Sequence, residues 1–174
     1  LKGVGKISSG ILSAAGIKTV GHLLLHKPRG YEDRQAAIPL ASAGSSGTVN
    51  TVVTVVTHEY IGHGKNATLK IIVEDETTRA TLVCFGRNFL RGTLLPGKRY
   101  FLYGQFAYRF GVLQSSVFET EPHNESPTAF GHILPVYPLF GNLTQGFFRK
   151  VIKNALNLYT ADLENELPEK IRTK

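Results

Sequence analysis

The chain has 174 residues, of which 42% are hydrophobic and 19% charged, so it can bury a sizeable core in one or two domains. Its formal net charge is +7 and its pI is about 9.6, with the excess of Lys and Arg in residues 1–119. This distribution favours a polyanionic partner for the first two thirds of the chain. Composition excludes a disulfide within one chain, because Cys84 is the single cysteine, and no apolar run approaches the ~18 residues of a membrane span.

The first predicted segment, residues 1–47, is a helical unit followed by a linker. Residues 1–34 are expected to be helical, with apolar residues at helical spacing in Lys6–Ala15 and a second helix capped by Thr19. Ala41–Gly47 contains only Ala, Ser and Gly, which is typical of a flexible linker.

The second predicted segment, residues 48–120, is a β-barrel. Apolar residues alternate with polar ones in five runs: Val49–Thr57, Ala67–Asp75, Arg79–Phe85, Lys98–Tyr108 and Val112–Glu119. A short helix is expected over Asn88–Leu95, between the third and fourth strands. Five strands with a helix in that place are typical of an OB-fold barrel, whereas an SH3-like barrel normally lacks the helix.

The third predicted segment, residues 121–174, is an extended linker followed by a helix. Glu121–Thr128 is polar, and the prolines of Leu134–Leu139 require an extended chain. The helix is expected from the cap Thr144 to about Tyr159, and its apolar face is wide enough to pack against more than this chain offers. The fold class is therefore mainly β with flanking helices.

The strongest candidate site is the end of the third strand, where Phe85 and Phe89 lie on either side of Arg87. Exposed rings beside a cation suit stacking on bases next to a phosphate chain. The alternative is that both rings close the barrel core. Ala80, Leu82 and Cys84 share the inward face of the strand, so we expect Phe85 to point outward.

Further cations and rings are interleaved along the predicted barrel, which favours nucleic-acid binding. The candidate DNA-binding residues are Phe85, Phe89, Arg87, Arg91, Lys65, Arg99, Arg109 and Phe110. For Phe101 and Tyr103 we expect packing under the flanking helices instead.

A weaker candidate is the turn Gly3-Val4-Gly5 with Lys6, which resembles the hairpin of a helix-hairpin-helix unit and would offer free amides to a phosphate. An ordinary tight turn is the alternative. No metal site and no catalytic residues are expected: His22, His26, His58 and His63 are assigned to a solvated face and a mobile loop.

Five motifs follow one another along the chain: Leu1-Lys-Gly-Val-Gly5, His26-Lys-Pro-Arg-Gly-Tyr-Glu-Asp-Arg34, Val83–Leu90, Pro135-Val-Tyr-Pro-Leu139 and Leu143-Thr-Gln145. In these residues and in their order, the chain resembles the start of RecG-type ATP-dependent DNA helicases. The resemblance implies a wedge domain that splits strands at a DNA junction, with Phe85 and Phe89 at the family's stacking positions. Cys84 and Gly86 depart from the residues that the family commonly has.

The function implied by the resemblance is recognition of branched DNA (stalled forks and Holliday junctions) and strand separation during ATP-driven branch migration. The segment itself is expected to be a non-catalytic monomer without a cofactor. ATP and magnesium would belong to motor domains of the same full-length chain, in the bacterial cytoplasm. Two alternatives remain open: a stand-alone OB-fold module for single-stranded DNA or RNA, and a protein-interaction OB domain.

Overall fold

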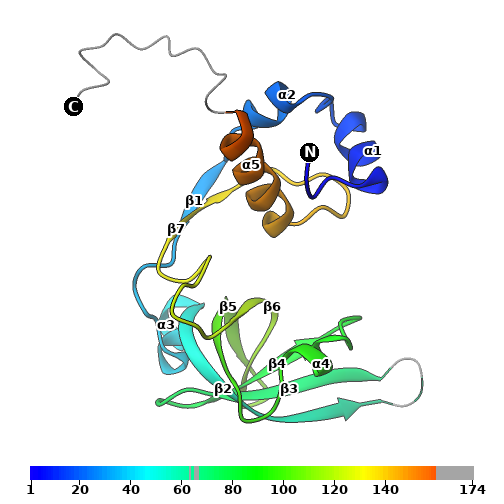
Figure 1. Cartoon of the computed structure of the whole chain (residues 1–174). Coiled ribbons are helices and arrows are strands. Elements are labelled where there is room, and N and C mark those ends of the chain that lie inside the picture. The colour runs from blue at the N-terminus through cyan, green and yellow to red at the C-terminus, as the bar shows by residue number, and fades with distance from the viewer. Residues whose placement is uncertain (63, 65–66, 160–174) are drawn as a thin grey trace, which may run out of the picture. The chain divides into compact units, whose positions relative to one another are not determined.

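The computed structural model describes residues 1–62, 64 and 67–159, which form two compact units (Figure 1). The barrel unit comprises Asp33–Leu134, and the helical unit comprises Leu1–Glu32 with the described part of Pro135–Lys174. This division differs from the three expected segments, because the residues that flank the barrel strands on both sides fold with the barrel.

The barrel has five strands: β2 (Thr48–Ile61), β3 (Thr68–Glu74), β4 (Arg79–Cys84), β5 (Arg99–Arg109) and β6 (Val112–Pro122). They close in the order β2-β3-β4-β6-β5, and the pairs are antiparallel except β4 with β6. Helix α4 (Leu90–Thr93) lies between β4 and β5 in the chain. The structure thus confirms a mainly β chain with an OB-fold barrel and flanking helices.

Alternation of apolar residues positions the barrel core, as expected from the sequence. Leu69, Ile71 and Val73 of β3 and Leu82 and Cys84 of β4 are fully buried in one cluster. Burial raises the pKa of the Cys84 thiol, while the nearby charge of Arg87 lowers it to a smaller extent. Cys84 therefore lies in the core as a small apolar residue.

The segment expected to be a linker is instead ordered against the barrel. It forms η1 (Leu40–Ser42) and α3 (Ala43–Ser46), with Leu40 and Ala43 buried in the barrel core. The Asp75 carboxylate holds the start of this segment, because its Oδ2 accepts the backbone N–H of Leu40 at 2.8 Å.

In the helical unit, α1 (Lys6–Ala14), α2 (Val20–Leu24) and α5 (Gln145–Tyr159) share a second core. The expectation that the wide face of α5 packs outside the chain is wrong, since Phe148, Val151 and Ala155 are fully buried in this core. Thr144 caps the helix, as its Oγ1 accepts the backbone N–H of Phe147 at 3.2 Å.

Two further expectations for the flanking residues are corrected. Residues 1–34 are not helical throughout, because β1 (Gly30–Asp33) pairs with β7 (Ile133–Val136) in a two-stranded sheet. His26 does not lie on a solvated face: its Nε2 is 3.1 Å from Pro138 O, and its ring packs on Phe148 at 5.0 Å.

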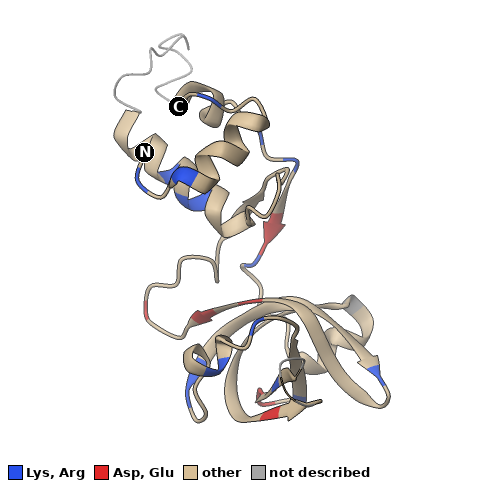
Figure 2. Cartoon of the chain, turned by 90° about the vertical axis from the view of Figure 1, so that its right-hand side faces the viewer, with Lys and Arg blue, Asp and Glu red and all other residues tan. Residues whose placement is uncertain are grey.

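Among the described residues, Lys and Arg occur in both units (Figure 2). Over the described ranges, no helix is long and apolar enough to cross a membrane. In the same residues, no three His, Cys, Asp or Glu side chains come together in a way that could hold a metal ion.

Candidate nucleic-acid interface

The end of β4 presents two aromatic rings to solvent. Phe85 is 67% exposed and Phe89 is 69% exposed, whereas Leu90, the first residue of α4, is buried in the barrel core. Gly86 makes the turn with a positive φ of 63°, a conformation that Gly adopts without steric cost. The rings therefore do not close the core, and they are available for stacking.

Arg87 is held by the barrel itself. Its Nη2 donates to the backbone oxygen of Ser116 at 2.8 Å, and its guanidinium lies 4.2 Å from the centroid of the Phe118 ring. It fastens the turn that carries Phe85 to β6. Arg91 is exposed, with its guanidinium 5.8 Å from the Tyr60 ring.

The tip of the β5–β6 hairpin carries Phe110, which is fully exposed at 102% of its reference area. Phe110 has a φ of 52° and Gly111 a φ of 76°. Left-handed backbone costs a residue with a Cβ about 1–2 kcal/mol. A large ring is thus displayed at a hairpin tip in an unfavourable conformation.

Two further candidate cations lie on β5. Arg99 and Arg109 are exposed at the first and last residues of this strand. Lys65 and His63 lie outside the described residues.

The candidate phosphate contact lies in the helical unit. Gly3 has a φ of 94°, Gly5 is the N-cap of α1, and Lys6 is exposed. Gly3 and Gly5 directly precede α1, which begins at Lys6. Among the described residues, the turn of residues 15–19 joins two helices, α1 and α2.

Phe101 and Tyr103 lie on the face of β5 opposite to the barrel core, and loop residues cover them where helices were expected. Phe101 stacks on Phe130 with the ring centroids 4.3 Å apart, and the Arg34 guanidinium lies 3.6 Å from the centroid of Tyr103.

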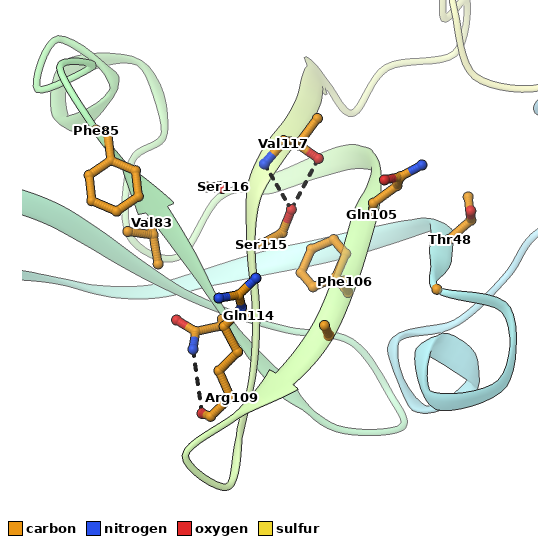
Figure 3. A pocket seen from close by; sticks show the side chains of 12 residues that line it. Thr48, Val83, Phe85, Gln105, Phe106, Arg109, Gln114, Ser115, Ser116 and Val117 are labelled. Atoms are coloured by element: carbon orange, nitrogen blue, oxygen red, sulfur yellow. Dashed lines mark hydrogen bonds between the residues drawn. The ribbon is translucent and has the colours of Figure 1, made fainter.

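Sequence reasoning missed a groove of about 590 Å³ on the barrel, which Figure 3 shows from close by. Phe85 and Val83 lie at one end, and Arg109 and Gln114 lie along another side. Its lining residues are Gly47, Thr48, Val83, Phe85, Gln105, Phe106, Ala107, Arg109, Gln114, Ser115, Ser116 and Val117. Strand alternation predicts which residues face outward, but it cannot show that residues of four strands, β2, β4, β5 and β6, surround a hollow.

Comparison with known proteins places this fold and these residues in one family. The family model of the RecG wedge domain matches residues 1–159. The ATP-dependent DNA helicase RecG of Treponema pallidum is 35% identical over 175 residues, which covers 100% of this chain and 25% of that protein. The same-named protein of Escherichia coli K12 is 28% identical, covering 98% of this chain and 25% of its own length.

A solved structure described as RecG bound to a three-way DNA junction superimposes with a TM-score of 0.80 at 27% identity. It covers 98% of this chain, whereas this chain covers 24% of that one. The chain thus spans about a quarter of the length of the relatives it matches. By the match over residues 1–159, this chain belongs to the RecG wedge domain family.

Proposed function

We propose that this chain is the DNA-binding wedge of a RecG-like helicase, which recognises branched DNA and splits its strands during ATP-driven branch migration in recombination and repair. Membership of the wedge family and the likeness to RecG bound to a three-way DNA junction support the proposal. The observation that carries it is the pair of exposed rings, Phe85 and Phe89, at the end of a buried strand.

The energetics of stacking fit this role. Opening a duplex costs about 1–2 kcal/mol per base step. A base stacked on an aromatic side chain returns about 1–3 kcal/mol, so one ring can offset roughly one opened pair. The wedge then lowers the free-energy cost of separating the two DNA strands without using ATP. In this proposal, ATP hydrolysis by the motor domains sets the direction of movement.

In this proposal the wedge carries no catalytic residue and holds no cofactor. ATP and magnesium bind motor domains of the same full-length protein, which acts as a monomer in the bacterial cytoplasm. Arg91, Arg99 and Arg109 supply phosphate contacts, together with Lys65 and the turn of Gly3, Gly5 and Lys6.

Gel-shift titration at fixed salt tests the proposal with three-way junctions, four-way junctions, linear duplex and linear single strands. We expect the branched DNAs to bind most tightly, with affinity that falls steeply as salt rises. The double variant Phe85→Ala/Phe89→Ala should lose this preference. Leu25→Ala is the matched control, because the Leu25 side chain is apolar and 72% exposed. This variant should retain the preference for branched DNA.

Equal affinity of the unaltered chain for junctions and linear single strands contradicts the proposal. That result would favour a stand-alone OB-fold module for single-stranded DNA or RNA. No binding to any of the four DNAs would favour a protein-interaction domain.

A further inference from the structure

Arg87 belongs to both of the turns that carry the exposed rings. Its backbone N–H donates to the backbone oxygen of Cys84 at 3.2 Å, which closes the turn that contains Phe85. Its own backbone oxygen accepts the N–H of Leu90 at 3.0 Å, which closes the next turn, with Phe89. The placement of both rings therefore depends on where the backbone of Arg87 lies.

The rings themselves do little to fix these turns. Phe85 and Phe89 are 67% and 69% exposed, so they bury little surface against the barrel. Gly86 has a positive φ, and a Cβ at this residue would meet nothing within 4 Å. Glycine also leaves the backbone more conformational freedom than any other residue. The segment between buried Cys84 and buried Leu90 therefore needs a tether to keep one conformation.

The side chain of Arg87 supplies a tether to β6. Its Nη2 donates to the backbone oxygen of Ser116 at 2.8 Å, and its guanidinium lies 4.2 Å from the centroid of the Phe118 ring. The Ser116 oxygen lies in a bulge, where Ser115 and Ser116 both stand opposite Phe106 of β5, and a bulge takes a residue out of the strand ladder. A charged donor strengthens the hydrogen bond, and the planar guanidinium suits a ring face.

We infer that Arg87 is a positioning residue, which holds the rings of Phe85 and Phe89 in the arrangement that stacks on bases. The inference rests on the proposed function and deepens it, because it gives the cation between the two rings a role other than the direct DNA contact expected from the sequence. When the turns are fixed before binding, the rings lose less conformational entropy as they stack. The tether thus raises the affinity for a junction without touching the DNA.

Titration of the variant Arg87→Met with a three-way junction and with linear duplex tests this role. Methionine keeps a long apolar stem and removes both the donors and the charge. We expect junction binding to weaken about tenfold, the size expected when two side chains must be ordered on binding. Linear duplex offers phosphates but no branch point, so its binding should change less than about twofold.

Arg91→Met is the matched control, because Arg91 is an exposed cation of α4 and one of the proposed phosphate contacts. This variant should weaken the binding of junction and duplex alike. It should also lower the slope of log affinity against log salt concentration by about one, the change for one lost phosphate contact. Arg87→Met should leave that slope unchanged.

The same substitution in the Phe85→Ala/Phe89→Ala background separates positioning from direct contact. With no rings left to position, Arg87→Met should change junction binding less than about twofold. A further tenfold loss in that background would overturn the inference, because Arg87 would then contact the DNA itself. Thermal melting shows that each variant is folded, and normal junction binding by folded Arg87→Met would also overturn the inference.

The proposed function survives either of these results as long as Phe85→Ala/Phe89→Ala still weakens junction binding. If that ring variant binds the junction normally, the proposed function fails, and the positioning role of Arg87 fails with it.

Discussion

The Arg34 guanidinium lies over the Tyr103 ring, 3.6 Å from its centroid, and its Nη1 donates to Glu119 Oε2 at 2.9 Å. Arg34 is only 2% exposed, although it is charged. Its backbone oxygen also accepts the side-chain amide of Asn50 at 2.8 Å. One arginine at the end of the motif that resembles the helicase family thus joins the segment before the barrel to β2, β5 and β6.

We therefore predict that Arg34→Gln lowers the free energy of unfolding by about 2–4 kcal/mol, because it removes a desolvated cation–π contact and the ion pair between a buried guanidinium and the half-exposed carboxylate of Glu119. Urea denaturation measures this loss. Arg79→Gln is the matched control, since the Arg79–Glu74 pair is exposed and should contribute at most about 1 kcal/mol. Equal losses of unfolding free energy in the two variants would show that Arg34 contributes no more to stability than an exposed arginine.

Local patterns were enough to predict the barrel and the exposed rings. Period-two alternation located the five strands, and the inward face of Ala80, Leu82 and Cys84 predicted that Phe85 points outward. The patterns could not predict contacts between distant residues. Ala41–Gly47 has the composition of a linker, but its order depends on the distant Asp75. The place of Arg34 likewise depends on the distant residues Tyr103 and Glu119.

The sequence predicted only part of the candidate site. Aromatic and cationic residue types identify rings and charges, and Phe85 is exposed as expected. Phe89 and Phe110, whose orientation the sequence left open, are exposed as well. Residue type does not reveal that Arg87 is already bonded to Ser116. The groove escaped prediction because it arises from a bulge in β6 opposite Phe106, which the alternation of polar and apolar residues does not encode.

Phe85→Ala should leave the free energy of unfolding within about 1 kcal/mol of its original value, because the ring is 67% exposed. Junction affinity should fall by about 1–3 kcal/mol, the contribution of one stacked base. Phe118→Ala provides the contrast, since its buried ring should cost about 3–5 kcal/mol of stability. A Phe85→Ala protein that melts early and still binds junctions normally when folded would contradict the stacking role.

Phe110→Asn should raise the free energy of unfolding by about 0.5–1 kcal/mol, because Asn tolerates the left-handed backbone of residue 110 better than Phe does. Phe110→Leu is the control that keeps the strain and removes the ring. If Phe110 contacts DNA through stacking, both variants should bind junctions more weakly by about 1–3 kcal/mol. Denaturation and junction titration on the two variants separate backbone strain from ring contact.

Gly104→Ala should destabilise the barrel by about 1–3 kcal/mol through overpacking. A Cβ at residue 104 would lie 2.7 Å from the backbone oxygen of Val117 and 2.9 Å from the Cβ of Phe118, so β5 and β6 would have to separate. Gly92→Ala is the matched control in α4, where a Cβ meets nothing within 4 Å. It should be neutral or stabilise by up to about 1 kcal/mol, and a comparable loss in both variants would exclude the steric explanation.

Because of Asp75, the free energy of unfolding of the barrel should depend on pH. Burial alone would raise the pKa of this carboxyl, but hydrogen bonds from the Thr77 hydroxyl and from the backbone N–H groups of Leu40, Thr77 and Thr78 outweigh it, so the pKa lies below its ordinary value of 3.8. A carboxyl whose pKa is lowered by folding stabilises the folded state above its unfolded pKa. That stabilisation is lost as the pH falls through the folded pKa.

Asp75→Asn should therefore lower the free energy of unfolding by about 1–2 kcal/mol at pH 7, because its amide nitrogen cannot accept the N–H of Leu40. The difference between the variant and the unaltered chain should shrink as the pH falls below 3.8, where the aspartate itself becomes protonated. Urea denaturation of both proteins at pH 7 and in acid measures this change. Glu76→Gln, which alters an exposed neighbour in the same turn, should show a smaller effect at pH 7. A constant difference between Asp75→Asn and the unaltered chain at every pH would mean that the charge of Asp75 does not hold η1 against the barrel.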